Sequence, residues 1–179
     1  MKKLLLILPA FLLTGCVSEP LPPITTTSTS GDPSSYQAVL NPASSGLTTD
    51  DTVEPLSPNL AIEGREETYN VEIGPNCYYS TKHNEMILKK GGYFKSTSTY
   101  SVSKLIIDSF NGQGLNYNVY AGSAAGETAL ESHASTIEPL VPAEGTVLEY
   151  LVEGDSWYID NTTDYKMGIY SITVVFTLN

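Results

Sequence analysis

The chain has 179 residues and a formal net charge of −11, and only 16% of its residues are charged. This length suits one folded domain with appendages. The acidic balance repels phosphate polymers and anionic lipid, which disfavours nucleic acid as a partner and disfavours membrane attachment through charge.

The first fifteen residues have the pattern of an export signal. Lys2 and Lys3 precede the apolar residues 4–13, which as a helix would rise only about 15 Å. A hydrocarbon core needs about 30 Å, so this run fits the apolar region of a signal peptide and is too short to span a membrane. Removing the peptide would leave seven basic and twenty acidic side chains, a net charge of −13.

The signal ends in Leu13-Thr14-Gly15-Cys16. This motif resembles the lipobox of bacterial lipoproteins, a leucine, a small residue, glycine or alanine, and then cysteine. The resemblance implies cleavage before Cys16 and lipidation of its sulfur, which would hold the protein outside the cytoplasm on a cell membrane or an outer membrane. Two or three acyl chains would make that anchor stable. A secretory signal that contains a cysteine by chance is the alternative.

Residues 17–64 differ in composition from the rest of the chain. They hold seven prolines and fifteen serines or threonines, and no lysine or arginine. Apolar residues are sparse and show no period, so the segment offers little surface to bury against its ordering entropy. We therefore expect residues 16–64 to form a lipidated, disordered tether.

From Arg65 onward the pattern is that of a β domain. Residues 69–73, 104–110, 115–120, 128–134, 146–152, 156–160 and 169–178 are predicted strands, because they alternate apolar and polar residues or are rich in β-branched and aromatic ones. Residues 111–114 predict a hairpin turn between two of them. The spacing of these strands, and the lack of a convincing amphipathic helix, favour an all-β antiparallel sandwich over residues 65–179.

Two stretches in this domain combine predicted strands with turns. They are Asn118-Val119-Tyr120-Ala121-Gly122-Ser123 and the segment from Trp157 to Val174, in which an Asn-Thr turn precedes the last strand. They resemble the jelly-roll accessory domains of bacterial surface proteins, whose topology is similar to carbohydrate-binding modules and galactose-binding-like domains. The resemblance implies a fold and carries over no ligand-binding residue.

Enzyme motifs are scarce in the sequence. His83 and His133 lie fifty residues apart and outside any metal-binding motif, and neither a nucleophile elbow nor a phosphate-binding loop occurs. With Cys16 lipidated, Cys77 would have no partner for a disulfide, and we expect it to be a small buried hydrophobe. A pair of carboxylates could still serve a hydrolase, which stays open as a minor alternative.

Oxygen-bearing side chains gather near the last turn. Asp155, Asp160 and Asp164 could supply ligands to calcium, although their spacing does not match an EF-hand loop. Turn formation by Asn161 and its threonine neighbours explains the same composition. Calcium is therefore a weak expectation, and no other cofactor is expected.

Tyrosines are unusually frequent, with twelve of them beside one tryptophan and four phenylalanines. Aromatic faces stack on sugar rings, and tyrosine adds a hydroxyl. If Trp157 faces the core, Tyr158 points outward, and Tyr120 lies opposite Val119 in the same way. Tyr120, Tyr158 and Trp157 are the candidate ligand-binding residues.

The sequence thus favours a lipid-anchored, non-catalytic β-sandwich that binds a glycan or a protein at the cell surface. The alternative is a structural or assembly lipoprotein that docks on another envelope protein.

Overall fold

The computed structural model describes residues 35–112 and 114–178, so the predicted signal peptide, Cys16 and the first part of the predicted tether lie outside the described residues. The described part is almost entirely β-structure in two antiparallel sheets, with one four-residue helix, α1 (Pro42–Ser45). The predicted antiparallel β-sandwich is confirmed.

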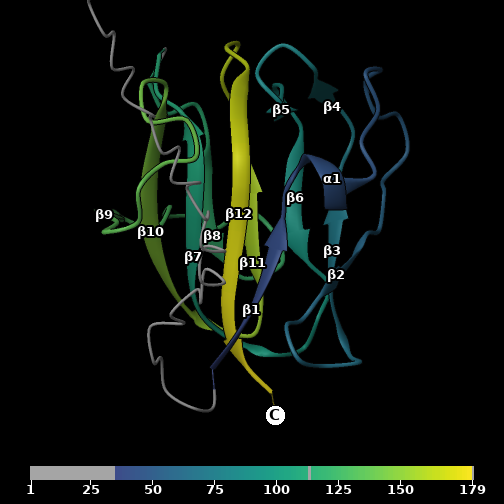
Figure 1. Cartoon of the computed structure of the whole chain (residues 1–179), viewed down its shortest axis with the longest axis vertical. Coiled ribbons are helices and arrows are strands. Elements are labelled where there is room, and N and C mark those ends of the chain that lie inside the picture. Colours follow the sequence, from purple (N-terminus) through teal and green to yellow (C-terminus); the bar gives the residue numbers. More distant parts are fainter. Residues whose placement is uncertain (1–34, 113, 179) are drawn as a thin grey trace, which may run out of the picture. The chain divides into compact units, whose positions relative to one another are not determined.

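The larger sheet has seven strands in the order β4-β5-β12-β7-β10-β9, with β1 also paired to β12. They are β1 (Ser35–Leu40), β4 (Cys77–Ser80), β5 (Glu85–Leu88), β7 (Ser101–Phe110), β9 (Ser132–Ala134), β10 (Gly145–Gly154) and β12 (Met167–Thr177). In Figure 1, β12 runs through the middle of the domain with β1 along its lower half. The upper part of the same edge pairs with β5.

The smaller sheet has five strands in the order β2-β3-β6-β11-β8. They are β2 (Asn59–Ala61), β3 (Thr68–Ile73), β6 (Tyr93–Ser96), β8 (Asn118–Ala121) and β11 (Trp157–Asp160). Each of these strands turns one set of alternating side chains toward the core. In β3, for example, Tyr69, Val71 and Ile73 are buried, and in β11 Trp157 and Ile159 are buried.

The core lies between the sheets and draws on nearly every strand. From the larger sheet it takes Leu105 and Ile107 of β7 and Phe176 of β12, and from the smaller sheet Phe94 of β6 and Trp157 of β11. Burial of each such side chain contributes about 1.5–3 kcal/mol relative to exposure. The sandwich is therefore held together chiefly by this single apolar layer.

Residues 35–64 are not a tether, which corrects the predicted domain boundary at residue 65. β1 pairs with β12 over six residues, and the side chains of Ala38 and Leu40 are buried. The Asn41 side chain caps α1 by accepting from the Ser44 N–H, and Leu60 of β2 is buried as well. These apolar residues are single and widely spaced, so the sequence shows no period although each of them packs into the core.

The predicted hairpin at residues 111–114 is also wrong. β7 pairs with β10 and β12, and the chain then crosses to β8 in the other sheet. Of the predicted strand 128–134, only β9 forms. The last strand matches its prediction closely, but a register shift between Ile169 and Ser171 alters the alternation there, so Tyr170 lies outside the core cluster.

Candidate functional site

Three tyrosines form a row on the outer face of the five-stranded sheet. Tyr120 of β8 is directly opposite Tyr158 of β11, and the next strand, β6, contributes Tyr93. The rings of Tyr93 and Tyr158 are stacked, with centroids 5.4 Å apart and an interplanar angle of 24°. The rings of Tyr158 and Tyr120 are 6.4 Å apart at 46°. We call Tyr93, Tyr158 and Tyr120 the tyrosine row.

The row is exposed because of strand alternation. The neighbours Trp157, Ile159 and Val119 are buried in the core, which turns Tyr158 and Tyr120 to the opposite face of the sheet. Both residues are half-buried, so part of each side chain meets solvent. This orientation is the one that the sequence predicted for Tyr120 and Tyr158.

Glu72 of β3 holds Tyr93 in place. The Tyr93 hydroxyl donates to Glu72 Oε1 over 2.6 Å, and Lys95 Nζ lies 2.9 Å from the same oxygen. The Lys95 ammonium also lies 5.4 Å from the centre of the Tyr93 ring. The ring also covers Gly74, where a Cβ would overlap it. Four contacts thus fix one end of the tyrosine row before any ligand arrives.

The same contacts shift two pKa values in opposite directions. The hydrogen bond to Glu72 raises the pKa of Tyr93 to about 12, with burial adding to the effect. The hydrogen bonds from Tyr93 and then from Lys95 lower the pKa of Glu72. At neutral pH the pair is therefore a neutral phenol and a carboxylate, a strong charge-assisted hydrogen bond.

Polar side chains border the row on the β8–β11 side. Asn118 of β8 donates from Nδ2 to Asp160 Oδ1 over 3.1 Å, next to Tyr120 and Tyr158 in their respective strands. Asn161 follows directly but is fully buried, and its side chain donates to the Leu88 and Tyr165 carbonyls. Asn118 is therefore a half-buried polar group at this end of the row, whereas Asp160 is only 8% exposed and serves as its hydrogen-bond acceptor, and Asn161 orders the turn.

Trp157 is a core residue, so its predicted contact with a ligand is wrong. Its ring is fully buried, and Nε1 donates to the Tyr69 hydroxyl over 3.0 Å. That hydroxyl in turn lies 2.8 Å from Ser96 Oγ. A ring enclosed in this way presents no face to a ligand.

The three carboxylates of the weak calcium expectation have separate partners. Asp155 accepts from Ser101, Asp160 from Asn118, and Asp164 from Lys90 Nζ over 2.7 Å. Across the described residues, no group of three or more histidine, cysteine or acidic side chains is placed to hold a metal ion. The structure therefore does not bring these three residues together as a site.

Cys77 is buried, as the sequence predicted. Its thiol is fully enclosed, and burial raises its pKa to about 12. His83 lies with Nδ1 3.1 Å from Glu144 Oε2, whereas His133 is exposed on β9. Within the described residues the Cys77 thiol pairs with the Pro75 and Tyr93 carbonyls and not with either histidine, so it forms no nucleophile–base pair there.

Sequence reasoning missed Glu72, Lys95 and the place of Tyr93 in a strand. Glu72 occupies the outward position of β3, whose alternation was predicted, so the signal for its orientation was available. The pairing of β3 with β6, which brings Glu72 opposite Lys95, joins segments that are separated by two other strands of the chain. That pairing cannot be inferred from local pattern.

Comparison of the chain with models of protein families, with curated proteins and with solved structures found no match. Within residues 35–112 and 114–178, no helix has the length and apolar character needed to cross a membrane.

Proposed function

We propose that this protein is a lipid-anchored protein of the bacterial envelope whose sandwich binds a glycan on the tyrosine row without catalysing a reaction. The observation that carries the proposal is the row itself, three adjacent tyrosine rings on one sheet face with hydrogen-bonding groups at both ends. The acidic charge of the chain agrees with a neutral or cationic partner.

Each part of the row matches a feature of a sugar chain. The partly exposed ring faces would stack on the apolar C–H faces of successive sugar units, since tyrosine offers apolar area at low rotamer cost. Asn118 and Glu72 would exchange hydrogen bonds with the ring hydroxyls. Because Glu72 already fixes Tyr93, little side-chain ordering is needed on binding, which favours affinity.

A glycan array that includes cell-wall polymers tests this proposal, with the full chain purified in detergent. We expect binding to at least one sugar class. In titration calorimetry with that sugar, Tyr158→Ala should weaken binding about tenfold, equivalent to about 1.4 kcal/mol. Tyr165→Ala is the matched control, because Tyr165 is a 67% exposed tyrosine outside the row.

Two results would contradict the glycan proposal. One is the absence of binding to every sugar on the array, and the other is an equal effect of Tyr158→Ala and Tyr165→Ala. Aromatic residues are also enriched in protein interfaces. Recovery of one stoichiometric envelope protein by the wild type, and its loss with Tyr158→Ala, would favour the alternative of an assembly lipoprotein.

The lipid anchor is tested separately. We expect Cys16 to incorporate labelled palmitate in the cell, and Cys16→Ser to abolish both the label and membrane retention while leaving the sandwich folded. An unlabelled wild-type chain would contradict the anchor and leave the tyrosine row unaffected.

A further inference from the structure

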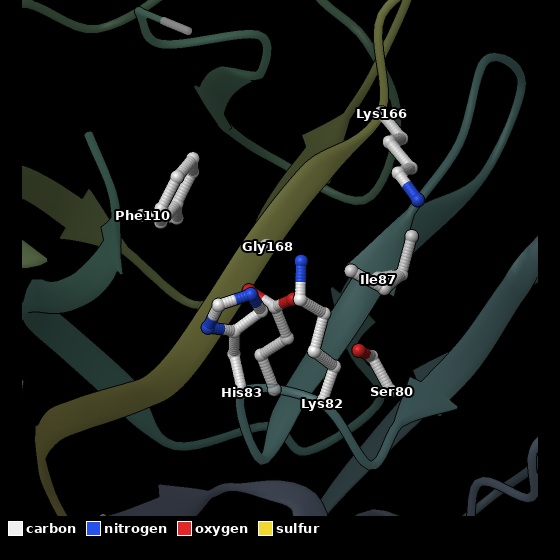
Figure 2. Close-up of a pocket in the computed structure, with 8 residues that line it drawn as sticks. Ser80, Lys82, His83, Ile87, Phe110, Lys166 and Gly168 are labelled. Atoms are coloured by element: carbon white, nitrogen blue, oxygen red, sulfur yellow. The ribbon is translucent and has the colours of Figure 1, made fainter. Parts of the chain in front are cut away.

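A small trough lies on the outer face of the seven-stranded sheet, whereas the tyrosine row lies on the five-stranded sheet. Its volume is about 210 Å³, smaller than the roughly 300–1,000 Å³ of clefts that hold drug-sized ligands. Figure 2 shows Phe110 on one side of Gly168 and β12, and Ile87 and Lys166 on the other. The trough therefore suits a molecule of few atoms.

Glycine at position 168 makes the floor of the trough. The carboxylate of Glu85, from the neighbouring strand β5, lies where a Cβ on Gly168 would be. A side chain at position 168 would displace that carboxylate. The sheet thus has a gap in its outer layer at β12, and an acidic group sits at the bottom of this gap.

Glu85 is a largely enclosed residue whose carboxylate has no hydrogen-bond or ion-pair partner among the described residues. Its exposed fraction is only 6%, yet it lines the trough. None of the hydrogen bonds or ion pairs found among the described residues involves its side chain. Its oxygens are not among the solvent-excluded unpaired atoms of the described chain, so they are open to the trough, where a cation would form a charge-assisted hydrogen bond with them. The trough therefore offers a position for a positively charged group.

Two lysines supply the opposite charge at the rim. Lys82 lines the trough and has no ion pair within the described chain, and Lys166 donates only to the Tyr78 hydroxyl, over 3.3 Å. Their ammonium groups could both reach an anion bound above Glu85. The trough thus combines one acidic position at its floor with basic positions at its edge.

The walls between these charges are apolar. The Phe110 ring bounds one side, backed by His83 with ring centroids 6.1 Å apart, and the Ile87 side chain bounds the other. His83 Nδ1 in turn lies 3.1 Å from Glu144 Oε2. A short hydrocarbon group would fit between Phe110 and Ile87 and would be shielded from water there.

From this arrangement the geometry points to a binding site for an amino-acid head group, in which the ligand's ammonium pairs with Glu85 and its carboxylate with Lys82 and Lys166. An apolar side chain of the ligand lies between Phe110 and Ile87. The site is separate from the tyrosine row and does not depend on glycan binding. Its ligand is either a free amino acid or an amino acid that is attached to a larger molecule through its side chain and keeps its ammonium and carboxylate free.

Titration calorimetry with the full chain tests the site without any variant. We expect L-leucine to bind, and N-acetyl-L-leucine and L-leucinamide each to bind at least tenfold more weakly, because one lacks the ammonium and the other the carboxylate. Equal binding of all three probes, or binding of neither L-leucine nor Nε-acetyl-L-lysine, would overturn the assignment.

Nε-acetyl-L-lysine separates the two sources of the head group, since its amino-acid head is free and its side chain is acylated. Binding as strong as that of L-leucine supports a head group carried on a side chain. Binding of L-leucine alone supports a free amino acid.

Charge-removing variants give a second test. Glu85→Gln keeps the size of the side chain and should weaken L-leucine binding at least tenfold, and Lys82→Met should weaken it severalfold. Lys90→Met is the control for Lys82→Met. It removes the same positive charge at a residue outside the trough and should leave binding unchanged. Circular dichroism of each variant checks the fold, and equal binding by a folded Glu85→Gln variant would contradict the site.

Discussion

Two buried tyrosine hydroxyls in this protein have opposite surroundings. The Tyr69 hydroxyl accepts a hydrogen bond from Trp157 Nε1 and lies 2.8 Å from Ser96 Oγ. The Tyr170 hydroxyl is also buried but has no hydrogen-bond partner in the described part of the chain. Since a buried polar group costs stability when it is unpaired, the Tyr69 hydroxyl should stabilise the fold and the Tyr170 hydroxyl should not.

Tyr69→Phe should lower the free energy of unfolding by about 1–3 kcal/mol, because it leaves the Trp157 N–H buried without an acceptor. Tyr170→Phe is the matched change, and it should be neutral or stabilising because it removes an unpaired hydroxyl. Urea denaturation of both variants measures the difference. Equal destabilisation by the two would show that the network around Tyr69 adds nothing beyond ring packing.

Cys77 makes the second residue-scale prediction. Burial raises the pKa of its thiol from the ordinary value of 9.0 to about 12, so the folded protein binds this proton more tightly than the unfolded chain. The stabilisation is complete below pH 9 and is lost as the pH rises toward 12. In that window the wild type should lose about 1.4 kcal/mol per pH unit more than Cys77→Ala.

Denaturation at several alkaline pH values measures that slope, with Cys77→Ala as the reference for the buried tyrosines that also titrate there. A thiol reagent at neutral pH gives an independent check. It should modify Cys77 only after unfolding, and rapid modification of the native protein would contradict the burial of this thiol.

At the scale of elements, β1 is the part of the chain whose importance was least evident. It pairs with β12 over six residues and buries Ala38 and Leu40 in the core. A chain beginning at residue 65 would lose this strand, α1 and β2, and would expose the edge of β12 and of β3. An exposed apolar edge strand is also prone to aggregation.

We therefore expect a fragment of residues 65–179 to be unfolded or aggregated and a fragment of residues 35–179 to fold. Circular dichroism and size-exclusion chromatography of the two fragments measure this. A monomeric, cooperatively unfolding 65–179 fragment would show that β1 and β2 are dispensable.

Strands with clear alternation could be predicted from the sequence, and others could not. β3 and β12 follow predicted segments because one face of each is apolar and the other polar over six or more residues. In β5 all four residues are buried, including Glu85, so no alternation exists to detect. β1 and β2 depend on partners far along the chain, whose pairing is not encoded locally.

The tyrosine row also has features that the sequence predicted and features that it did not. The outward orientation of Tyr158 and Tyr120 follows from alternation around Trp157 and Val119 and was predicted. Their grouping with Tyr93, and its support by Glu72, depends on how β3, β6 and β11 are ordered in the sheet. The sequence shows which side chains of a strand share a face of the sheet, but the order of the strands in the sheet is set by tertiary packing.

At the scale of the whole domain, the two proposed sites lie on the outer faces of different sheets with the packed core between them. No hydrogen bond or ion pair found among the described residues joins the trough residues Glu85 and Lys82 to the tyrosine row. Distant sites without shared partners behave additively. Ligands of the two sites should therefore bind independently.

Independence is measured by titrating each ligand in the presence of a saturating amount of the other. Tyr158→Ala should affect only the sugar, and Glu85→Gln only L-leucine. A change of more than about threefold in either affinity on adding the second ligand would reveal coupling between the sheets.

The pairing of β1 with β12 also determines how the domain responds to pulling. Ser35 is paired with Thr177, so the two ends of the described chain leave the seven-stranded sheet side by side. Tension applied between residues 35 and 177 would open the Ser35–Thr177 pair first and then each pair up to Leu40–Ile172 in turn. The hydrogen bonds would thus be loaded one after another like a zipper, and single-molecule extension should show β1 detaching at low force before the core unfolds.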